Sequence, residues 1–149
     1  MNNPRIVYIL GRLNDTYAGP KTENILIENP LTVEHILPQQ WVENWPLPDG
    51  SRGLAGTELW AADEVDSRRV ASARRHAALQ TFGNLTILTQ ALNSATSNAA
   101  WEDKKPELLR HSLLPINLHL QESAVWDEEA IERRARRLLE RALGLWPRP

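Results

Sequence analysis

The sequence predicts an α+β domain that is mostly helical and contains one element of two short antiparallel strands and a helix. Two observations place the strands. "LTVEHI" is apolar and β-branched and lies between Pro30 and Pro38, and "NLTILT" comes directly after Gly83, a helix breaker. A third observation predicts the helices, because apolar residues recur at helical spacing in several other segments. We expect the two strands and their helix within residues 31–98, embedded in the additional helices.

The segments around the strands predict the remaining elements in order. The Pro- and Gly-rich segments 18–30 and 41–56 should be loops. The last helix has the clearest signals: Asp127 can serve as its N-cap, and Trp126 and Ile131 have the spacing of a hydrophobic staple. Its apolar stripe should include Leu138 and Leu139. The predicted helices are residues 4–17, 63–79, 99–111 and 127–146, and a helix from about Gln90 should complete the two-strand element.

Length and composition limit the classes of protein to consider. A chain of 149 residues with 42% hydrophobic residues fits a single domain over residues 1–149. The absence of cysteine excludes disulfides and thiolate zinc sites. The apolar patch near the N-terminus is too short to span a membrane and lacks the features of a signal peptide. We therefore expect a cytoplasmic protein without a membrane partner.

The charge pattern does not favour a stand-alone nucleic-acid-binding protein. The net charge is −2, whereas such proteins usually carry a large basic excess. Positive charge is nevertheless clustered in the last predicted helix. Acidic residues alternate with that cluster, so we expect the i,i+4 ion pairs Glu129–Arg133 and Glu132–Arg136. The pattern favours a solvated helix face.

Two adjacent residues with chemical potential end the first predicted strand. His35 can accept a proton near neutral pH, and the Glu34 carboxylate is a hard oxygen ligand suited to Mg²⁺. Neighbouring residues of a strand point to opposite faces, so both can serve one site only if the strand ends there and the backbone turns. Pro38 makes such a turn plausible. The alternative is a pair of surface polar residues at a strand end.

The second polar stretch is "GNLTILTQALNSATSN", residues 83–98. Asn84 opens the second strand, and Asn93 follows it by nine residues in the predicted helix. An Asn in the first turns of a helix is usually a cap or a surface residue. Here Asn93 belongs to an unusually polar segment that follows the second strand in the sequence and includes Ser94, Ser97 and Asn98. This polarity supports the alternative hypothesis that Asn93 has a functional role.

Together, "VEHILPQ" and "GNLTILTQALN" resemble the motif of the His-Me finger (HNH) nucleases. That motif is an acidic residue and His, then Ile-x-Pro, then Asn-Leu, then Asn or His nine residues on. More narrowly, "EHILPQ", "FGNLTILT" and "NSATSNAAWEDK" resemble the C-terminal nuclease domain of GmrSD-type modification-dependent restriction enzymes, over nearly the whole chain. The resemblance implies a ββα-metal fold and a metal-dependent DNA endonuclease.

The resemblance also implies a role for individual residues. His35 would be the catalytic general base that activates water. Asn84 would complete the catalytic motif as a structural residue that ties down the loop orienting the His35 imidazole. Glu34 and Asn93 would coordinate one divalent cation, Mg²⁺ or Mn²⁺. Lys104 matches a lysine of the narrower family and, with Asn98, is a candidate contact for DNA phosphate.

A structural zinc, which many HNH proteins bind through cysteine pairs, is not expected. Thr89 and Leu92 stand where one such pair would fall. The three histidines outside the motif should be structural or exposed. They are His76, His111 and His119.

The implied partners are DNA, which can be modified, and an N-terminal ParB-like nucleotide-hydrolysing domain or subunit. This chain would then hold only the nuclease part of a phage-defence restriction system. Two other interpretations stay open. One is a non-catalytic DNA-binding or regulatory module on a degenerate nuclease scaffold. The other is a helical protein-interaction domain in which the motif is a coincidence, and it predicts no metal binding.

Overall fold

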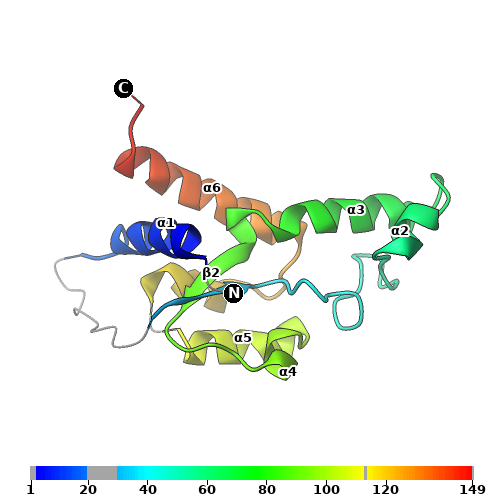
Figure 1. Ribbon diagram of the computed structural model, residues 1–149, viewed down its shortest axis with the longest axis horizontal. Coiled ribbons are helices and arrows are strands. Elements are labelled where there is room, and N and C mark those ends of the chain that lie inside the picture. Colours follow the sequence, from blue (N-terminus) through cyan, green and yellow to red (C-terminus); the bar gives the residue numbers. More distant parts are fainter. Residues whose placement is uncertain (1–2, 20–29, 113, 149) are drawn as a thin grey trace.

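A two-stranded antiparallel sheet lies at the centre of the computed structural model (Figure 1). Strand β1 (Thr32–His35) pairs with strand β2 (Leu85–Leu88), so that Glu34 lies opposite Thr86 and His35 lies opposite Leu85. All four residues of β2 are buried. The structure describes residues 3–19, 30–112 and 114–148. The two predicted strands and the mostly helical α+β fold are confirmed.

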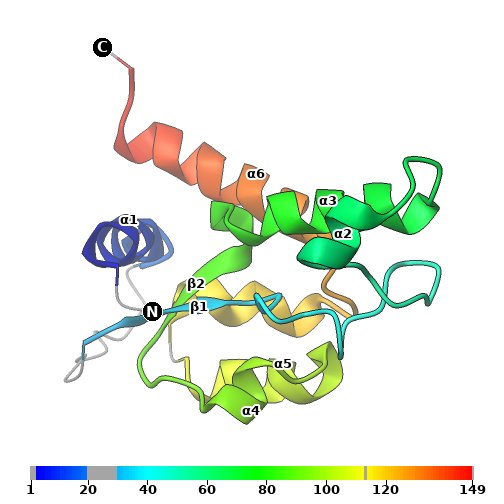
Figure 2. The ribbon, with the colours of Figure 1, turned by 45° about the vertical axis from the view of Figure 1, so that its right-hand side comes forward.

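The helices cover this sheet from several sides. Their bounds are α1 Pro4–Asp15, α2 Thr57–Ala61, α3 Ser67–Leu79, α4 Ser94–Ser97, α5 Trp101–Arg110 and α6 Glu128–Leu145, with 3₁₀ segments η1 Phe82–Asn84 and η2 Pro115–Glu122. Helices α3 and α6 lie on one side of the strands and α4 and α5 on the other, as Figures 1 and 2 show. Within the described residues, no helix has the length and apolar character needed to cross a membrane.

The helix predictions for residues 4–17, 99–111 and 127–146 are confirmed to within about two residues at each end. The predicted helix 63–79 begins later, at Ser67, because the Asp66 side chain caps it by accepting from the Arg68 backbone amide. Helix α2 and segment η2 were not predicted, since both are short and lack a clear apolar period. The loop predicted at 41–56 is confirmed, whereas residues 20–29 of the other predicted loop lie outside the described residues.

The helix predicted from about Gln90 is wrong. Only Ser94–Ser97 form a helix, α4, and the chain from residue 91 to residue 93 is irregular. The reason is local, because Asn93 has an extended backbone and its side-chain oxygen accepts from the Thr96 amide at 2.9 Å. This side-chain bond caps the helix at Asn93 and sets its start.

Helix α6 anchors the C-terminal part of the fold through its first turns. The Asp127 carboxylate accepts from the Ala130 amide, as predicted for the N-cap, and Trp126 and Ile131 are both buried in the same hydrophobic cluster. The predicted apolar stripe holds at Leu138, which is buried, but Leu139 is 58% exposed. The predicted ion pairs Glu129–Arg133 and Glu132–Arg136 are present at 3.8 and 3.7 Å.

The prediction of a solvated basic face on α6 fails at one position. Arg134 is only 2% exposed, and its guanidinium Nη1 donates to the backbone carbonyl oxygens of Gly83 and Leu85 at 3.1 and 2.7 Å. A charged residue is rarely buried without an ion partner, so the sequence pattern alone could not predict this position.

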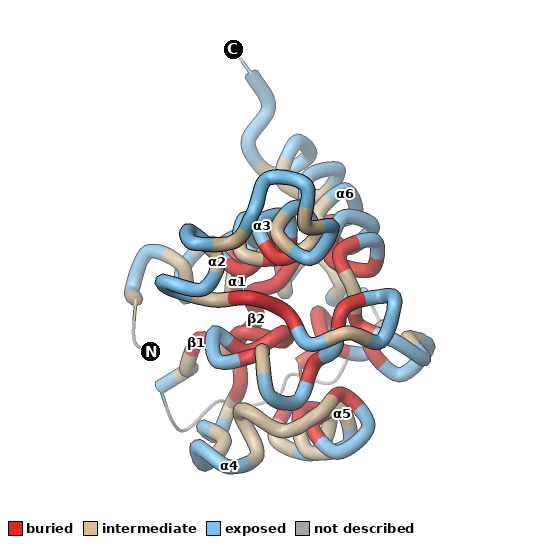
Figure 3. Tube along the Cα trace, turned by 90° about the vertical axis from the view of Figure 1, so that its right-hand side faces the viewer, coloured by how far each residue is buried: buried red, intermediate tan, exposed pale blue. Residues whose placement is uncertain are grey.

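The core consists of two clusters of buried apolar residues, and each includes residues of the sheet. The first cluster contains apolar residues from the connection between β1 and β2, from α5 and from the start of α6, including Trp45, Trp101 and Trp126. The ring centroids of Trp101 lie 6.1 Å from Trp45 and 5.5 Å from Trp126. The other cluster joins α1, the strands, η2 and the middle of α6. Buried backbone accordingly concentrates around the two strands in Figure 3.

We predict that Gly83→Ala will destabilise the protein by about 1–3 kcal/mol, because it overpacks a close contact. A Cβ at Gly83 would lie 2.2 Å from the Ile131 carbonyl oxygen and 3.0 Å from the Ala135 Cβ. Gly11→Ala is the matched control, since nothing lies within 4 Å of that position in α1 and Ala favours a helix by roughly 1 kcal/mol. Urea unfolding would measure both changes. Equal stability of Gly83→Ala and the wild type would contradict the packing described.

Candidate active site

A polar pocket of about 190 Å³ is lined by residues from the end of β1 and the end of α4. Glu34 and His35 come from β1, and Ser97 and Asn98 come from the end of α4. The remaining lining residues come from β1 and the turn after it, and are Val33, Pro38, Gln39 and Gln40. The pocket therefore joins the two polar stretches of the sequence.

Glu34 and His35 reach one pocket because the chain leaves the sheet directly after His35. The Ile36 amide still donates to the Asn84 carbonyl oxygen at 2.9 Å, and Leu37 is then held by the Asn84 side chain. The Leu37 amide donates to Asn84 Oδ1 at 2.8 Å, and Asn84 Nδ2 donates to the Leu37 carbonyl oxygen at 2.9 Å. The backbone bend expected after His35 is thus fixed by a paired amide contact.

Asn84 acts from beneath the pocket and does not line it. Its side chain is fully buried, Nδ2 also donates to the Leu79 carbonyl oxygen, and Oδ1 accepts from Trp126 Nε1 at 3.2 Å. Four hydrogen bonds satisfy the amide completely. Asn84 is therefore a positioning residue that ties the turn after β1, α3 and the start of α6 together, a structural role like the one that the resemblance implies.

His35 is buried, with 8% of its surface exposed, and its ring is held from the end of α3. Nε2 lies 3.2 Å from Gln80 Oε1. With the Gln80 oxygen as acceptor, Nε2 carries the ring proton and Nδ1 keeps a lone pair. Burial lowers the pKa of His35 below its usual 6.5, and the Gln80 contact and the Glu34 charge oppose this shift only in part. The imidazole is therefore largely neutral at pH 7.

Glu34 is held by two contacts that both fall on Oε1. Ser97 Oγ donates to it at 2.7 Å, and Lys104 Nζ forms an ion pair with it at 2.8 Å. Lys104 also donates to the His35 carbonyl oxygen. Burial lowers the pKa of Lys104, and the Glu34 carboxylate opposes that shift. These contacts fix Oε1, and within the described residues Oε2 has neither a hydrogen bond nor an ion pair, so it can take another ligand.

The predicted role of Lys104 as a phosphate contact does not fit its position. The side chain is fully buried, and its ammonium group is directed at Glu34 and the backbone of β1. A phosphate at the pocket mouth would not reach it in this arrangement. Lys104 therefore supports the site from below, as Asn84 does.

Asn98, and not Asn93, lies in the pocket with Glu34 and His35. Asn93, predicted as a metal ligand, is exposed, uses its side-chain oxygen to cap α4 and does not line the pocket. Asn98, predicted as a phosphate contact, lines the pocket with Glu34 and His35. Its Nδ2 donates to the Ser94 carbonyl oxygen at 3.0 Å. The late start of α4 explains this difference.

A family model for the C-terminal domain of GmrSD restriction endonucleases matches residues 1–141. This chain belongs to that family. The match makes the chain a domain of restriction endonucleases, and it confirms the narrower of the two resemblances found in the sequence. No curated protein and no solved structure is significantly similar to the chain.

The candidate active site of this GmrSD C-terminal domain includes two residues to which the sequence analysis assigned no role. Gln80 holds the His35 ring from the end of α3, and Ser97 holds Glu34 from α4. The polar run around Ser97 was a signal, but no sequence feature singles out Gln80. Within the described residues, no three acidic or histidine side chains cluster as a metal centre. A cation here would instead combine one carboxylate with an amide and water.

Proposed function

We propose that this GmrSD C-terminal domain is a metal-dependent DNA endonuclease of the HNH (His-Me finger) type, with His35 as its general base. The observation that supports this most strongly is the setting of His35. Its imidazole is buried, neutral and oriented, and it shares a pocket with the carboxylate of Glu34 and the amide of Asn98. Hydrolysis of a phosphodiester requires a held base beside a site for cationic stabilisation.

The protein's own residues account for the proton transfer. A neutral His35 can accept a proton from a water molecule that attacks phosphorus in line with the leaving 3′-oxygen. Gln80 fixes the ring tautomer, and the Asn84 clamp on Leu37 fixes the backbone that carries the ring. The low pKa keeps the base unprotonated at neutral pH. A bound Mg²⁺ or Mn²⁺ supplies stabilisation of the negative charge that develops on the phosphate and the leaving oxygen.

Glu34 and Asn98 are the residues that would hold this cation. Both line the pocket, and carboxylate and amide oxygens are the hard ligands that Mg²⁺ prefers. Mg²⁺ commonly retains several water ligands and needs only one or two carboxylates, so a larger acidic cluster is unnecessary. The free oxygen of Glu34, beside one already held by Ser97 and Lys104, fits this pattern.

The proposed biological setting rests on the resemblance to modification-dependent restriction enzymes. The domain would act on DNA, including modified phage DNA, as part of a restriction system with an N-terminal ParB-like nucleotide-hydrolysing domain or subunit. The net charge of −2 supports a module that relies on a partner for affinity, because non-specific DNA binding rests mainly on basic contacts to phosphate.

One observation favours a second candidate, a non-catalytic DNA-binding or regulatory module. The Lys104 ammonium already neutralises Glu34 at 2.8 Å, so the pocket has less negative charge to attract a cation than an unpaired carboxylate would. This candidate predicts no nicking, so a nicking assay separates it from the endonuclease.

We predict that Asn98→Ala will weaken Mn²⁺ binding by at least roughly tenfold, the smallest loss typical of removing a residue that only supports a metal ligand. Asn93→Ala is the matched control, because it removes the same amide five residues earlier but outside the pocket. Isothermal titration with Mn²⁺ would measure both. Stronger loss in Asn93→Ala than in Asn98→Ala would restore the ligand assignment made from the sequence and contradict the one made from the pocket.

A further inference from the structure

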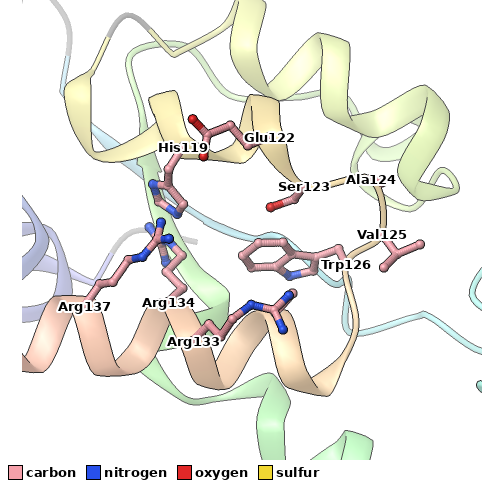
Figure 4. Close-up of a pocket in the computed structure, with 10 residues that line it drawn as sticks. His119, Glu122, Ser123, Ala124, Val125, Trp126, Arg133, Arg134 and Arg137 are labelled. Atoms are coloured by element: carbon pink, nitrogen blue, oxygen red, sulfur yellow. The ribbon is translucent and has the colours of Figure 1, made fainter.

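A second pocket, of about 330 Å³, lies between η2 and α6 (Figure 4). Arg134 and Arg137 extend from α6 toward His119 on η2, and Arg133 extends toward the ring of Trp126. It has no lining residue in common with the His35 pocket. The proposed cleavage mechanism uses none of these arginines, so their clustering needs its own explanation.

Arg134 is a buried cation without an acidic partner in the described part of the chain. Its Nη1 donates to three backbone carbonyl oxygens, those of Phe82, Gly83 and Leu85, and Nη2 donates to Thr86 Oγ1. Nε is buried, and no described residue forms a hydrogen bond with it. Carbonyl dipoles offset part of the cost of burying this charge, but buried charges are normally paired with an opposite charge.

The neighbouring side chains add to the positive charge. Arg133 and Arg137 are exposed at the pocket rim, and Arg133 forms an ion pair with the solvent-exposed Glu129 at 3.8 Å. Glu122 also lines the pocket, so three arginines face one carboxylate there. A solvated carboxylate on η2 cannot neutralise all three guanidinium groups, and the pocket retains an excess of positive charge.

His119 contributes polarity but no charge. Burial and the nearby charges of Arg134 and Arg137 lower its pKa to about 4, so the imidazole is neutral at pH 7. Its Nε2 is buried without a hydrogen-bond partner in the described residues. The pocket thus contains two unsatisfied buried nitrogen atoms, in His119 and Arg134, beside two exposed guanidinium groups.

We propose that this pocket binds a phosphate group, which Arg133 and Arg137 contact at the rim and Arg134 stabilises from below. Guanidinium groups bind phosphate oxygens through paired, charge-assisted hydrogen bonds, and a phosphate supplies the negative charge that the pocket lacks. The phosphate can belong to a nucleic-acid strand or to a free phosphate compound. The inference does not depend on catalysis at His35.

The test compares Arg137→Gln with Arg136→Gln. The two residues are adjacent and exposed on α6, and the substitutions remove the same charge, but only Arg137 lines the pocket. Isothermal titration with inorganic phosphate and fluorescence anisotropy with a short DNA duplex, both in EDTA at low salt, would measure binding without cleavage. Thermal unfolding would check that each variant is folded.

We expect Arg137→Gln to weaken binding of at least one probe about tenfold, the effect of losing one hydrogen bond between charged groups. Arg136→Gln should change the affinity for either probe less than about twofold. Both substitutions remove the same long-range electrostatic attraction, which salt screens, but only Arg137 lines the pocket. Loss restricted to DNA identifies a strand phosphate, and loss restricted to inorganic phosphate identifies a free one. Equal effects of the two substitutions, or no binding of either probe, would overturn the proposal. A protein that binds phosphate in this way but does not nick DNA would refute only the proposed endonuclease.

Discussion

Replacing His35 with Ala should lower the rate of plasmid nicking by roughly 10²–10⁴-fold, the usual loss when a general base is removed. His35 lines the pocket, and within the described residues its ring makes one side-chain hydrogen bond, with Gln80. The substitution should therefore change activity far more than stability. The measurement is the initial rate of conversion of supercoiled to nicked plasmid at saturating Mn²⁺.

A second histidine provides the control for this prediction. His111 lies at the end of α5 with its Nε2 3.3 Å from Glu107, outside the pocket. His111→Ala should nick at the wild-type rate. Comparable losses in both variants would show that the effect of His35→Ala is not specific to the base.

The pH dependence of the rate follows from the same residue. A general base must be unprotonated to act, so the rate should rise with pH through the pKa of His35 and then stay constant. Burial lowers this pKa below 6.5, which places the rising limb on the acid side of pH 6.5. A limb centred well above pH 7 would contradict the assignment of His35 as the base.

Replacing Lys104 with Met should destabilise the protein by about 3 kcal/mol, near the lower end of the cost of breaking a buried ion pair by removing one partner. Lys104 is fully buried, whereas Glu34 is 14% exposed, so water can relieve part of the loss. The His35 carbonyl oxygen also loses its donor. For a chain of this size, thermal unfolding should show a decrease of roughly 6–12 °C in Tm.

A double substitution provides the control for Lys104. Glu34→Gln removes the charge that Lys104→Met would leave unpaired, so the double variant should be more stable than the sum of the two single changes predicts. Strict additivity would mean that the two side chains do not interact energetically. That result would contradict the description of Lys104 as the support of Glu34.

The features that could be predicted from the sequence are those that depend on residues close together in the chain. The strand segments have β-branched and apolar residues between Pro and Gly breakers, and Asp127 stands where a helix cap is needed. The adjacency of Glu34 and His35 predicted that both serve one site, and both line the pocket, whereas Asn84 and Asn93, which were expected to share it, do not. Chain order was enough for these features because neighbouring residues determine them.

The buried cations could not be predicted. Arg134 lies in a run of alternating acidic and basic residues that is typical of a solvated face, and Lys104 lies in a similarly charged segment. Both are buried because of partners distant in sequence: β2 and η1 carbonyl oxygens for Arg134, and β1 for Lys104. Helical position alone does not reveal such partners.

The choice between Asn93 and Asn98 also depended on information that the sequence did not show clearly. The apolar residues before Asn93 suggested that the helix begins near Gln90, whereas the Asn93 cap starts it at Ser94. This shift moves the residue facing the pocket to the end of α4. The contacts of Gln80 with His35 and of Ser97 with Glu34 span 45 and 63 residues, and only the folded chain brings them together.

The central claim is that the pocket around His35 cleaves DNA with the help of a divalent cation. The most direct measurement is nicking of supercoiled DNA by the wild-type chain in Mn²⁺ and in EDTA, with His35→Ala beside it in both. We expect nicking only by the wild type and only in Mn²⁺. Nicking that persists in EDTA, or equal nicking by His35→Ala in Mn²⁺, would contradict the claim.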